Sequence, residues 1–270
     1  ACHINLTNEA AILVYGNARL RGTRDAAIQI HSSDKTGRGI HFLQADTVSI
    51  QHLKLSYNQC FRAGGLLLNG AMTCQAHKLE LQHLEFTDIN TEDALNVISS
   101  SQIKLEHLTF NNCTGDGLDI DFSSGEVVGG VFREMGGDAI DLSSSNIHLK
   151  DIEIAVVADK GISVGEGSTV DVRNTRINQA YIGLANKDGS QTRASDIQLQ
   201  NCSYGFTSFR KKPFFGGGQL EVENCQLDAK ILYPYTLEEG QKLLVDGKVM
   251  VSTHTKGALA TLFYPAIFQD

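Results

Sequence analysis

The sequence contains no tryptophan, three prolines and six cysteines in 270 residues, and no two cysteines form a CxxC pair. Zinc ribbons and thioredoxin-like redox sites need such pairs, so both are excluded. No hydrophobic run approaches the roughly 18 residues of a membrane-spanning helix, and we expect no membrane span. The 23 Lys and Arg against 31 Asp and Glu leave a formal charge of −8. A net acidic chain without a basic stripe fits the phosphate backbone poorly, so we expect no nucleic-acid partner.

The cysteines allow two interpretations. Cys60 and Cys74 are near enough in sequence to close one loop with a disulfide. The alternative is a set of free thiols, because an unpaired cysteine behaves as a small hydrophobic residue and is often buried. We favour free thiols, and the cysteines therefore do not define the compartment of the chain.

A repeat of about 22 residues organises the chain. Each copy carries an apolar anchor, as in Asp93 to Val97, Asp116 to Ile120 and Asp138 to Leu142. Such a fixed step is the sequence signature of a solenoid. The anchors are spaced 23, 22, 22, 22 and 22 residues apart: Leu95, Leu118, Ile140, Ile162, Leu184 and Phe206.

A second alternating segment lies between the anchors, for example at Ile103 to Phe110, Ile147 to Ile154 and Val170 to Ile177. Alternation with a period of two residues is typical of a strand with one buried face. The repeat is too short for a strand–helix–strand unit, which needs about 30 residues, and no helical periodicity is sustained. The spacing of a leucine-rich repeat does not recur. We therefore predict an all-β fold, a right-handed parallel β-helix (solenoid) whose coils stack about 4.8 Å apart.

The regularity of the repeat varies along the chain. We expect the parallel β-helix to span residues 1–230, with irregular, wider coils to about residue 90 and regular 22-residue coils over 91–228. Ile40, Leu66 and Leu95 are the expected anchors of the wider part, with loops around 58–65 and 69–76. An irregular C-terminal cap or tail should follow over 231–270, because the end of a solenoid needs cover. Its apolar segment 259–268 is a candidate for self-association or for docking a neighbour.

Stacked coils place equivalent residues in columns, and two of these columns contain possible metal ligands. Asp93, Asp116 and Asp138 stand before the main strand, with Asp159 displaced by one residue. We favour turn capping by these aspartates over a calcium ladder. At another turn we favour left-handed turn geometry over a histidine metal site, because His, Asn, Asp and Gly all tolerate that geometry. This turn column contains His52, His83, His107, Gly129, Asp151, Asn174, Asp196 and Asn224.

Two columns of the main strand should face outward, because they alternate with the buried anchors. One contains Asn96, Asp119, Asp141, Ser163, Ala185 and Thr207, and the next contains Ile98, Asp121, Ser143, Gly165, Lys187 and Phe209. Asp119, Asp121 and Asp141 are therefore expected to form an exposed triangle. Basic residues further along the same surface should lie at its opposite end. The expected substrate-binding residues are Asn96, Lys187, Arg210, Lys211 and Lys212.

The triangle of Asp119, Asp121 and Asp141 is compatible with two reactions on a polysaccharide. Paired carboxylates act as acid and as base or nucleophile in glycoside hydrolysis. The same carboxylates are candidate ligands for calcium, the one candidate cofactor, which would neutralise a uronate carboxylate in a lyase. A lyase also needs a base, and the strand spacing places Lys187 about 14 Å from Asp121, which counts against that reaction. The residues leave open whether the chain is an enzyme.

Several phrases resemble the right-handed β-helix repeat regions of bacterial proteins, including some attached to CotH-type kinase domains. The resemblance covers roughly residues 11–227 and implies the pectate-lyase-like fold and a secreted, cell-surface or periplasmic location. It implies no established activity, because the Gly-His-Gly element of polygalacturonase-like hydrolases and the Asp-Pro-His motif of mannuronan epimerases are absent. The Trp-Ile-Asp-His element of pectate lyases is absent too. The phrases are Ile30 to Ile40, Glu92 to Asn96, Gly115 to Phe122, Gly137 to Asp141, Lys160 to Glu166 and Lys211 to Gly216.

The sequence supports two functional hypotheses. The first is an extracytoplasmic β-helix protein that binds a polysaccharide along its exposed parallel sheet, with cleavage or modification by a lyase or hydrolase reaction left open. The second is a non-catalytic structural or interaction module of a larger bacterial surface protein. Glycan binding favours the first, and association through residues 259–268 favours the second.

Overall fold

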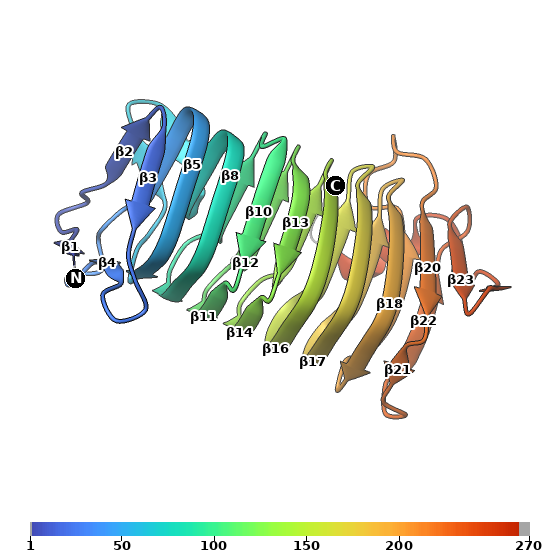
Figure 1. Ribbon diagram of the computed structural model, residues 1–270. Coiled ribbons are helices and arrows are strands. Elements are labelled where there is room, and N and C mark those ends of the chain that lie inside the picture. The colour runs from blue at the N-terminus through green and yellow to red at the C-terminus, as the bar shows by residue number, and fades with distance from the viewer. Residues whose placement is uncertain (1, 265–270) are drawn as a thin grey trace.

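The computed structural model describes residues 2–264 and has the predicted architecture, about 11 stacked coils of a parallel β-solenoid (Figure 1). Equivalent strands of successive coils pair in parallel, and the described strands join into a 22-stranded sheet with one separate two-stranded hairpin. The sheet bends at the turns of every coil, so the cylinder has three faces around one apolar core. We number the faces in the order in which the chain passes through them.

The strands are distributed over the three faces as follows. The first face contains β2 (Ile12–Tyr15), β9 (Asp93–Ile98), β12 (Asp116–Asp121), β15 (Ile140–Ser143), β19 (Tyr204–Phe209) and β22 (Tyr233–Leu237). The second contains β3 (Ala18–Arg21), β10 (Gln102–Glu106), β13 (Ser124–Val128), β20 (Gln219–Glu223), β23 (Lys242–Val245) and its antiparallel neighbour β24 (Lys248–Val249). The third contains β1 (His3–Asn5), β4 (Ile28–His31), β11 (Thr109–Cys113), β14 (Val131–Met135) and β21 (Gln226–Leu227). Long strands bend from one face to the next: β5 (Ile40–Ser56), β8 (Gly70–Ile89), β16 (Asn146–Gly165), β17 (Thr169–Lys187) and β18 (Gln191–Gln200).

The predicted anchors form a continuous buried column. Leu118 pairs with Leu95 on one side and with Ile140 on the other, and the register continues to Phe206. Phe86, Phe110 and Phe132 stack beside this column with ring centroids 4.8 and 4.6 Å apart. The 22-residue step therefore sets the register, because any other step would bring polar positions into the core.

The turn column between the second and third faces has the predicted left-handed geometry. Its residues have positive φ, for example 56° at His83 and 57° at Asp151. The rings of the three histidines stack on one another. The ring centroid of His83 lies 4.6 Å from that of His52 and 4.9 Å from that of His107. The positive φ at each histidine supports the turn interpretation.

The wider N-terminal coils differ from the expectation. Ile40 pairs with Met72, which in turn pairs with Leu95, so Met72 is the anchor and Leu66 is not. Leu66 lies in an antiparallel hairpin of β6 (Phe61–Ala63) and β7 (Leu66–Leu68). The hairpin turn uses Gly64 and Gly65, both with positive φ, which glycine adopts without strain. The loop expected around 58–65 is therefore this hairpin, whereas β8 already begins within the loop expected around 69–76.

The coils also continue beyond the boundary expected at residue 230. β22 pairs with β19, and β23 pairs with β20, so coiled structure extends to Val245. The chain then turns back, and helix α1 (Ala258–Phe263) packs on the first face. Leu259 is buried in this contact, whereas Thr261 and Leu262 are exposed, so α1 partly covers its own chain and docking through this segment stays a prediction. Residues 265–268 of that segment lie outside the described residues.

All six cysteines are free thiols, so the disulfide alternative for Cys60 and Cys74 is wrong. Cys74 is completely buried in the core, whereas Cys60 lies near the base of the β6–β7 hairpin. Burial raises the pKa of the Cys74 thiol because an apolar environment disfavours the thiolate. The thiol therefore serves as a packing group.

Candidate functional site

The two outward columns predicted for the first face are present. Asp119 pairs with Asn96 and Asp141, and Asp121 pairs with Ile98 and Ser143. We call the outward surface of β9, β12, β15 and the end of β16 the aspartate face. It brings together the predicted triangle of Asp119, Asp121 and Asp141. Asp119 and Asp121 occupy alternate positions of β12, and Asp141 lies beside Asp119 on β15. Asn96 also lies here, and its side-chain amide donates a hydrogen bond to Asp119 at 2.8 Å.

A third column completes the aspartate face. Asp116 Oδ1 accepts the backbone N–H of Asp138 at 2.6 Å, and Asp138 Oδ1 accepts the backbone N–H of Lys160 at 2.9 Å. Each carboxylate thus caps the following coil, whereas the sequence had suggested capping of its own turn. Lys160, and not the expected Asp159, continues this column and pairs with Ile182 of the next coil. The 22-residue step from Asp138 to Lys160 was the signal that could have identified it.

Lysine side chains reach into the acidic cluster, contrary to the expected separation of the two charges. Lys160 Nζ lies 3.1 Å from Asp138 Oδ1 and 2.5 Å from Asp159 Oδ2. Lys187 Nζ lies 3.9 Å from Asp141 Oδ1. Its side chain passes over Gly165, where an added Cβ would lie 3.3 Å from Lys187 Cε. The spacing of the strands separates the backbones of these residues, but a lysine side chain is long enough to cross that distance.

The loop after β19 carries the remaining predicted basic residues. The backbone N–H groups of Lys211 and Lys212 both donate to Asp188 Oδ1, at 2.8 and 2.7 Å, which fixes the loop. Lys212 Nζ pairs with Glu166, and Lys211 Nζ lies 4.3 Å from the ring centroid of Tyr264. Both lysines therefore border the aspartate face. Arg210 makes no side-chain hydrogen bond or ion pair within residues 2–264, so its predicted contact with substrate stays a prediction.

Burial and charge push the pKa values of neighbouring aspartates apart. Burial, followed by the nearby Asp93, Asp121 and Asp141 carboxylates, raises the pKa of Asp119 far above its ordinary value. Burial and the charge of Asp141 raise the pKa of Asp121 to about 6. Burial also acts to raise the pKa of Asp141, but the Lys187 ammonium, Ser163 and the Lys160 and Lys211 ammonium groups together outweigh it, and the net shift is downward. The pKa values of Asp119 and Asp141 are therefore shifted in opposite directions.

A protonated and an ionised carboxylate side by side can act as a proton donor and as a base or nucleophile. Pairs of titratable groups with pKa values driven in opposite directions characterise acid–base sites. Asp119 and Asp141 are strand neighbours, with a spacing of about 4.8 Å between their backbones. Asp121 extends the acidic surface along the same strand as Asp119.

The acidic oxygens that approach one another most closely differ from the predicted calcium set. Ligand atoms of Asp116, Asp138 and Asp141 lie within 4.8 Å of one another, so only Asp141 is shared with the predicted triangle. Carboxylate oxygens are the donors that calcium prefers. However, Asp138 already pairs with Lys160, and Lys187 faces Asp141. The ammonium groups thus supply positive charge where a cation would otherwise be needed, and calcium binding stays a prediction.

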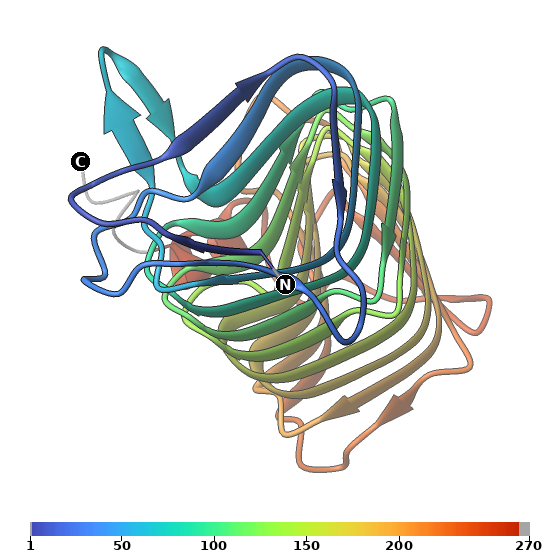
Figure 2. The same cartoon turned by 60° about the vertical axis from the view of Figure 1, so that its left-hand side comes forward.

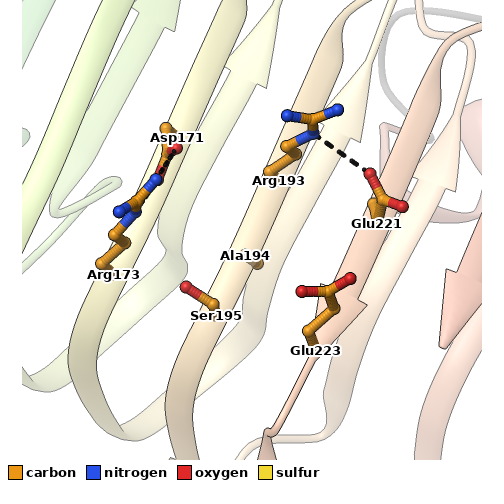
Figure 3. A pocket seen from close by; sticks show the side chains of 7 residues that line it. All are labelled: Asp171, Arg173, Arg193, Ala194, Ser195, Glu221 and Glu223. Carbon is orange, nitrogen blue, oxygen red and sulfur yellow. Dashed lines mark hydrogen bonds and ion pairs between the residues drawn. The ribbon is translucent and has the colours of Figure 1, made fainter. Parts of the chain in front are cut away.

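The second face also has a groove, with a volume of about 360 Å³ (Figure 3). Arg173 binds both carboxylate oxygens of Asp171 at 2.7 Å, and Arg193 Nε lies 3.2 Å from Glu221 Oε2. Figure 3 shows Asp171 and Arg173 on one strand and the Arg193–Glu221 pair joining the next two strands, beside the small side chains Ala194 and Ser195. The arginines of the groove have carboxylate partners, so we assign no catalytic role to it.

The family comparison agrees with this architecture. A family model described as the right handed beta helix region matches residues 38–229. The chain belongs to the right-handed β-helix family. The match spans the coils that carry the aspartate face, and it names no reaction or ligand. No helix among the described residues of this β-helix protein is long and apolar enough to cross a membrane, as the sequence predicted.

Comparison with solved structures finds the catalytic domain of a GH87 alpha-1,3-glucanase in complex with tetrasaccharides. The identity is 11% and the TM-score 0.29, over 93% of this β-helix chain. The chain spans 64% of the length of that structure. A search of curated proteins finds no match. Because so weak a likeness carries no argument about function, the functional reasoning rests on the side chains of the aspartate face.

Proposed function

We propose that the aspartate face binds a polysaccharide and hydrolyses its glycosidic bonds, with Asp119 as the acid and Asp141 as the nucleophile. What supports this most is that two adjacent outward carboxylates have pKa values shifted in opposite directions. The proposal includes an extracytoplasmic location, where polysaccharides of cell walls and matrices are found. The link to CotH-type bacterial surface proteins stays a prediction of the resemblance.

The proposed reaction has two steps. In the first, Asp141 attacks the anomeric carbon and Asp119 gives its proton to the departing glycosidic oxygen, so that the C–O bond breaks and a glycosyl ester forms. In the second, Asp119, now ionised, takes a proton from water, which displaces Asp141 and regenerates both groups. Retaining hydrolases place the two carboxyl groups about 5 Å apart, close to the strand spacing of about 4.8 Å. The released sugar should therefore keep its anomeric configuration.

Uronate elimination is a second candidate reaction, supported by Lys211. Burial and the neighbouring Lys187 and Lys160 ammonium groups lower the pKa of Lys211, which makes it a better base at neutral pH. The objection that the lysines lie too far from the acidic cluster no longer applies, because Lys187 approaches Asp141. In this reaction Lys211 would remove the proton next to the uronate carboxylate and the glycosidic oxygen would leave. The product would contain a carbon–carbon double bond that absorbs ultraviolet light.

The test is a panel of neutral and acidic polysaccharides, assayed for new reducing ends and for ultraviolet absorbance. The proposal expects reducing ends without absorbance, with loss of about 10²- to 10⁴-fold in Asp119→Asn and Asp141→Asn. Asp171→Asn on the second face is the matched control and should keep full activity. Absorbance that disappears in Lys211→Met would select elimination instead.

The non-catalytic alternative has its own outcome in the same panel. If a glycan binds but is not cleaved, the protein is a non-catalytic binding module. If no glycan binds or is cleaved, the proposal is overturned. Leu259 of α1 packs on its own chain, whereas Leu262 is exposed, so association through residues 259–264 would use the outer side of α1.

A further inference from the structure

The exposed part of the aspartate face is short. In the column that carries the catalytic pair, Asp119 and Asp141 are partly exposed, whereas the flanking Asn96 and Ser163 are 4% and 0% exposed. Asn96 and Ser163 lie three strand spacings apart, about 14 Å. The opening around the two aspartates is therefore only about two coils wide along the axis of the cylinder.

A hairpin closes the N-terminal side of this opening. Thr73 and His41 precede Asn96 in the same outward column, and both are buried. The ring of His41 lies 5.8 Å from that of Phe61 in the β6–β7 hairpin, and Arg38 donates a 2.6 Å hydrogen bond to the backbone of Arg62. Figure 2 shows the hairpin standing out from the coils on the side of the stack where α1 also lies. A chain running along the axis meets this hairpin.

Helix α1 closes the C-terminal side. Leu259 packs against Ile182, Ala185, Tyr204 and Phe209, which are the outward residues of the next coils. The ring of Phe263 meets Tyr204 edge-on at 5.0 Å and lies 5.1 Å from Phe209. The outward surface of these coils is therefore occupied by the chain itself and is closed to a long polymer.

On this C-terminal side, lysine side chains lie between α1 and the acidic cluster. Lys160 and Lys211 place their ammonium groups 5.3 and 4.3 Å from the ring centroid of Tyr264. Lys160 has carboxylate partners in Asp138 and Asp159, and Lys187 faces Asp141. Within residues 2–264, Lys211 has an aromatic partner but no carboxylate partner. A carboxylate group on a ligand is the natural additional partner for this ammonium group.

We propose that the aspartate face receives the end of an acidic polysaccharide chain, with the carboxylate of the terminal sugar at Lys211. This inference rests on the proposed function, and it adds the mode of binding and the residues that define it. The β6–β7 hairpin and α1 prevent a long chain from passing along the axis of the coils. A chain that lies along this axis can therefore reach the Asp119–Asp141 pair only with its terminal sugars, so cleavage starts from a chain end.

The test measures how many protein molecules bind each glycan chain. Asp119→Asn is titrated calorimetrically with galacturonate oligomers of increasing length, since this variant lacks the acid but keeps the Asp141–Lys187 pair. We expect affinity to stop rising after a few sugars and one protein to bind each chain, however long. A number of bound proteins that grows with chain length would overturn the inference while supporting glycan binding. No binding of any glycan would overturn both proposals.

A second variant tests the role of Lys211 directly. Lys211→Met should weaken binding of galacturonate oligomers about tenfold, the equivalent of 1.4 kcal/mol for one charge-assisted contact. Lys150→Met, on the exposed second face, is the control and should bind like the parent. Two results would overturn the placement of the ligand carboxylate at Lys211. One is equal affinity of the Lys211→Met variant and the parent for galacturonate oligomers. The other is that the parent binds uncharged maltose oligomers as tightly as galacturonate oligomers.

Discussion

The aspartate face and the second face are made in the same way, yet their charges behave differently. On the second face, a single column runs Lys104, Glu126, His148, Asp171, Arg193 and Glu221, with opposite charges or a neutral partner on neighbouring strands. On the aspartate face, acidic residues follow one another in two columns, with Asp121 in a third, and they are buried or partly buried. Alternating, exposed charges neutralise one another in water, whereas repeated, buried charges shift each other's pKa values. The two faces share one register, so sign pattern and burial, and not register, account for the different pKa shifts.

The largest expected difference between the two faces is in how much a single ion pair contributes to the free energy of unfolding. Lys160→Met leaves Asp138 buried without its ammonium partner and should lower the free energy of unfolding by about 3–5 kcal/mol. Arg193→Met removes a residue whose side chain is 80% exposed and should cost about 0–1 kcal/mol. Urea unfolding at neutral pH measures both. Equal losses would contradict the distinction between the faces.

The pH dependence of stability should have opposite signs on the two faces. The folded pKa of Asp121, about 6, exceeds its ordinary value of 3.8, so between these values the folded state binds more protons. Its contribution therefore falls as pH rises through this window, and Asp121→Asn should be more stable by about 1–2 kcal/mol at pH 7. Arg173 lowers the pKa of Asp171, so that carboxylate stabilises the fold above its ordinary pKa and loses the effect in acid. Asp171→Asn should then be slightly less stable at pH 7, and gains in both variants would contradict this account.

A smaller effect is expected from Gly165, the residue over which Lys187 passes. Gly165→Ala should push the Lys187 side chain aside and raise the pKa of Asp141 towards its ordinary value. The added methyl group meets only the flexible end of a lysine, so stability should change by less than about 1 kcal/mol. Carboxyl carbon NMR titration measures the pKa. Gly216→Ala, which has open space around it, is the control, and an unchanged Asp141 pKa in both variants would show that Lys187 does not depend on this gap.

The smallest effect is expected in the histidine turn column between the second and third faces. Burial and the charges of His52 and His107 lower the pKa of His83 below 6.5. Below pH 6.5 the unfolded chain therefore binds more protons at this residue, and the fold loses stability as pH falls. His83→Asn keeps a residue that tolerates positive φ and should remove a few tenths of a kcal/mol of this acid sensitivity. Thermal unfolding at pH 5 and pH 8 tests this, and an unchanged difference would place the acid sensitivity elsewhere.

The sequence was informative wherever a property repeats from coil to coil. Leu118 and Ile140 predicted the register, and the register correctly placed Asp119 beside Asp141. The sequence was uninformative where a contact depends on a single side chain or an insertion. Nothing in the repeat indicated that Lys187 bends back to Asp141, or that Leu66 belongs to a hairpin.

By itself, the sequence determined the coil. A 22-residue period with buried anchors allows one register, because a shift would expose apolar positions and bury charged ones. Only the tertiary structure decided how the outward carboxylates differ from one another. Helix α1 and the β6–β7 hairpin come from segments outside the regular repeat, and they cover other parts of the same outward surface. Burial and neighbouring carboxylates raise the pKa of Asp119, whereas Lys187 and other nearby groups lower that of Asp141. A row of identical aspartates in the sequence does not contain this difference, because it depends on which side chains lie close in space.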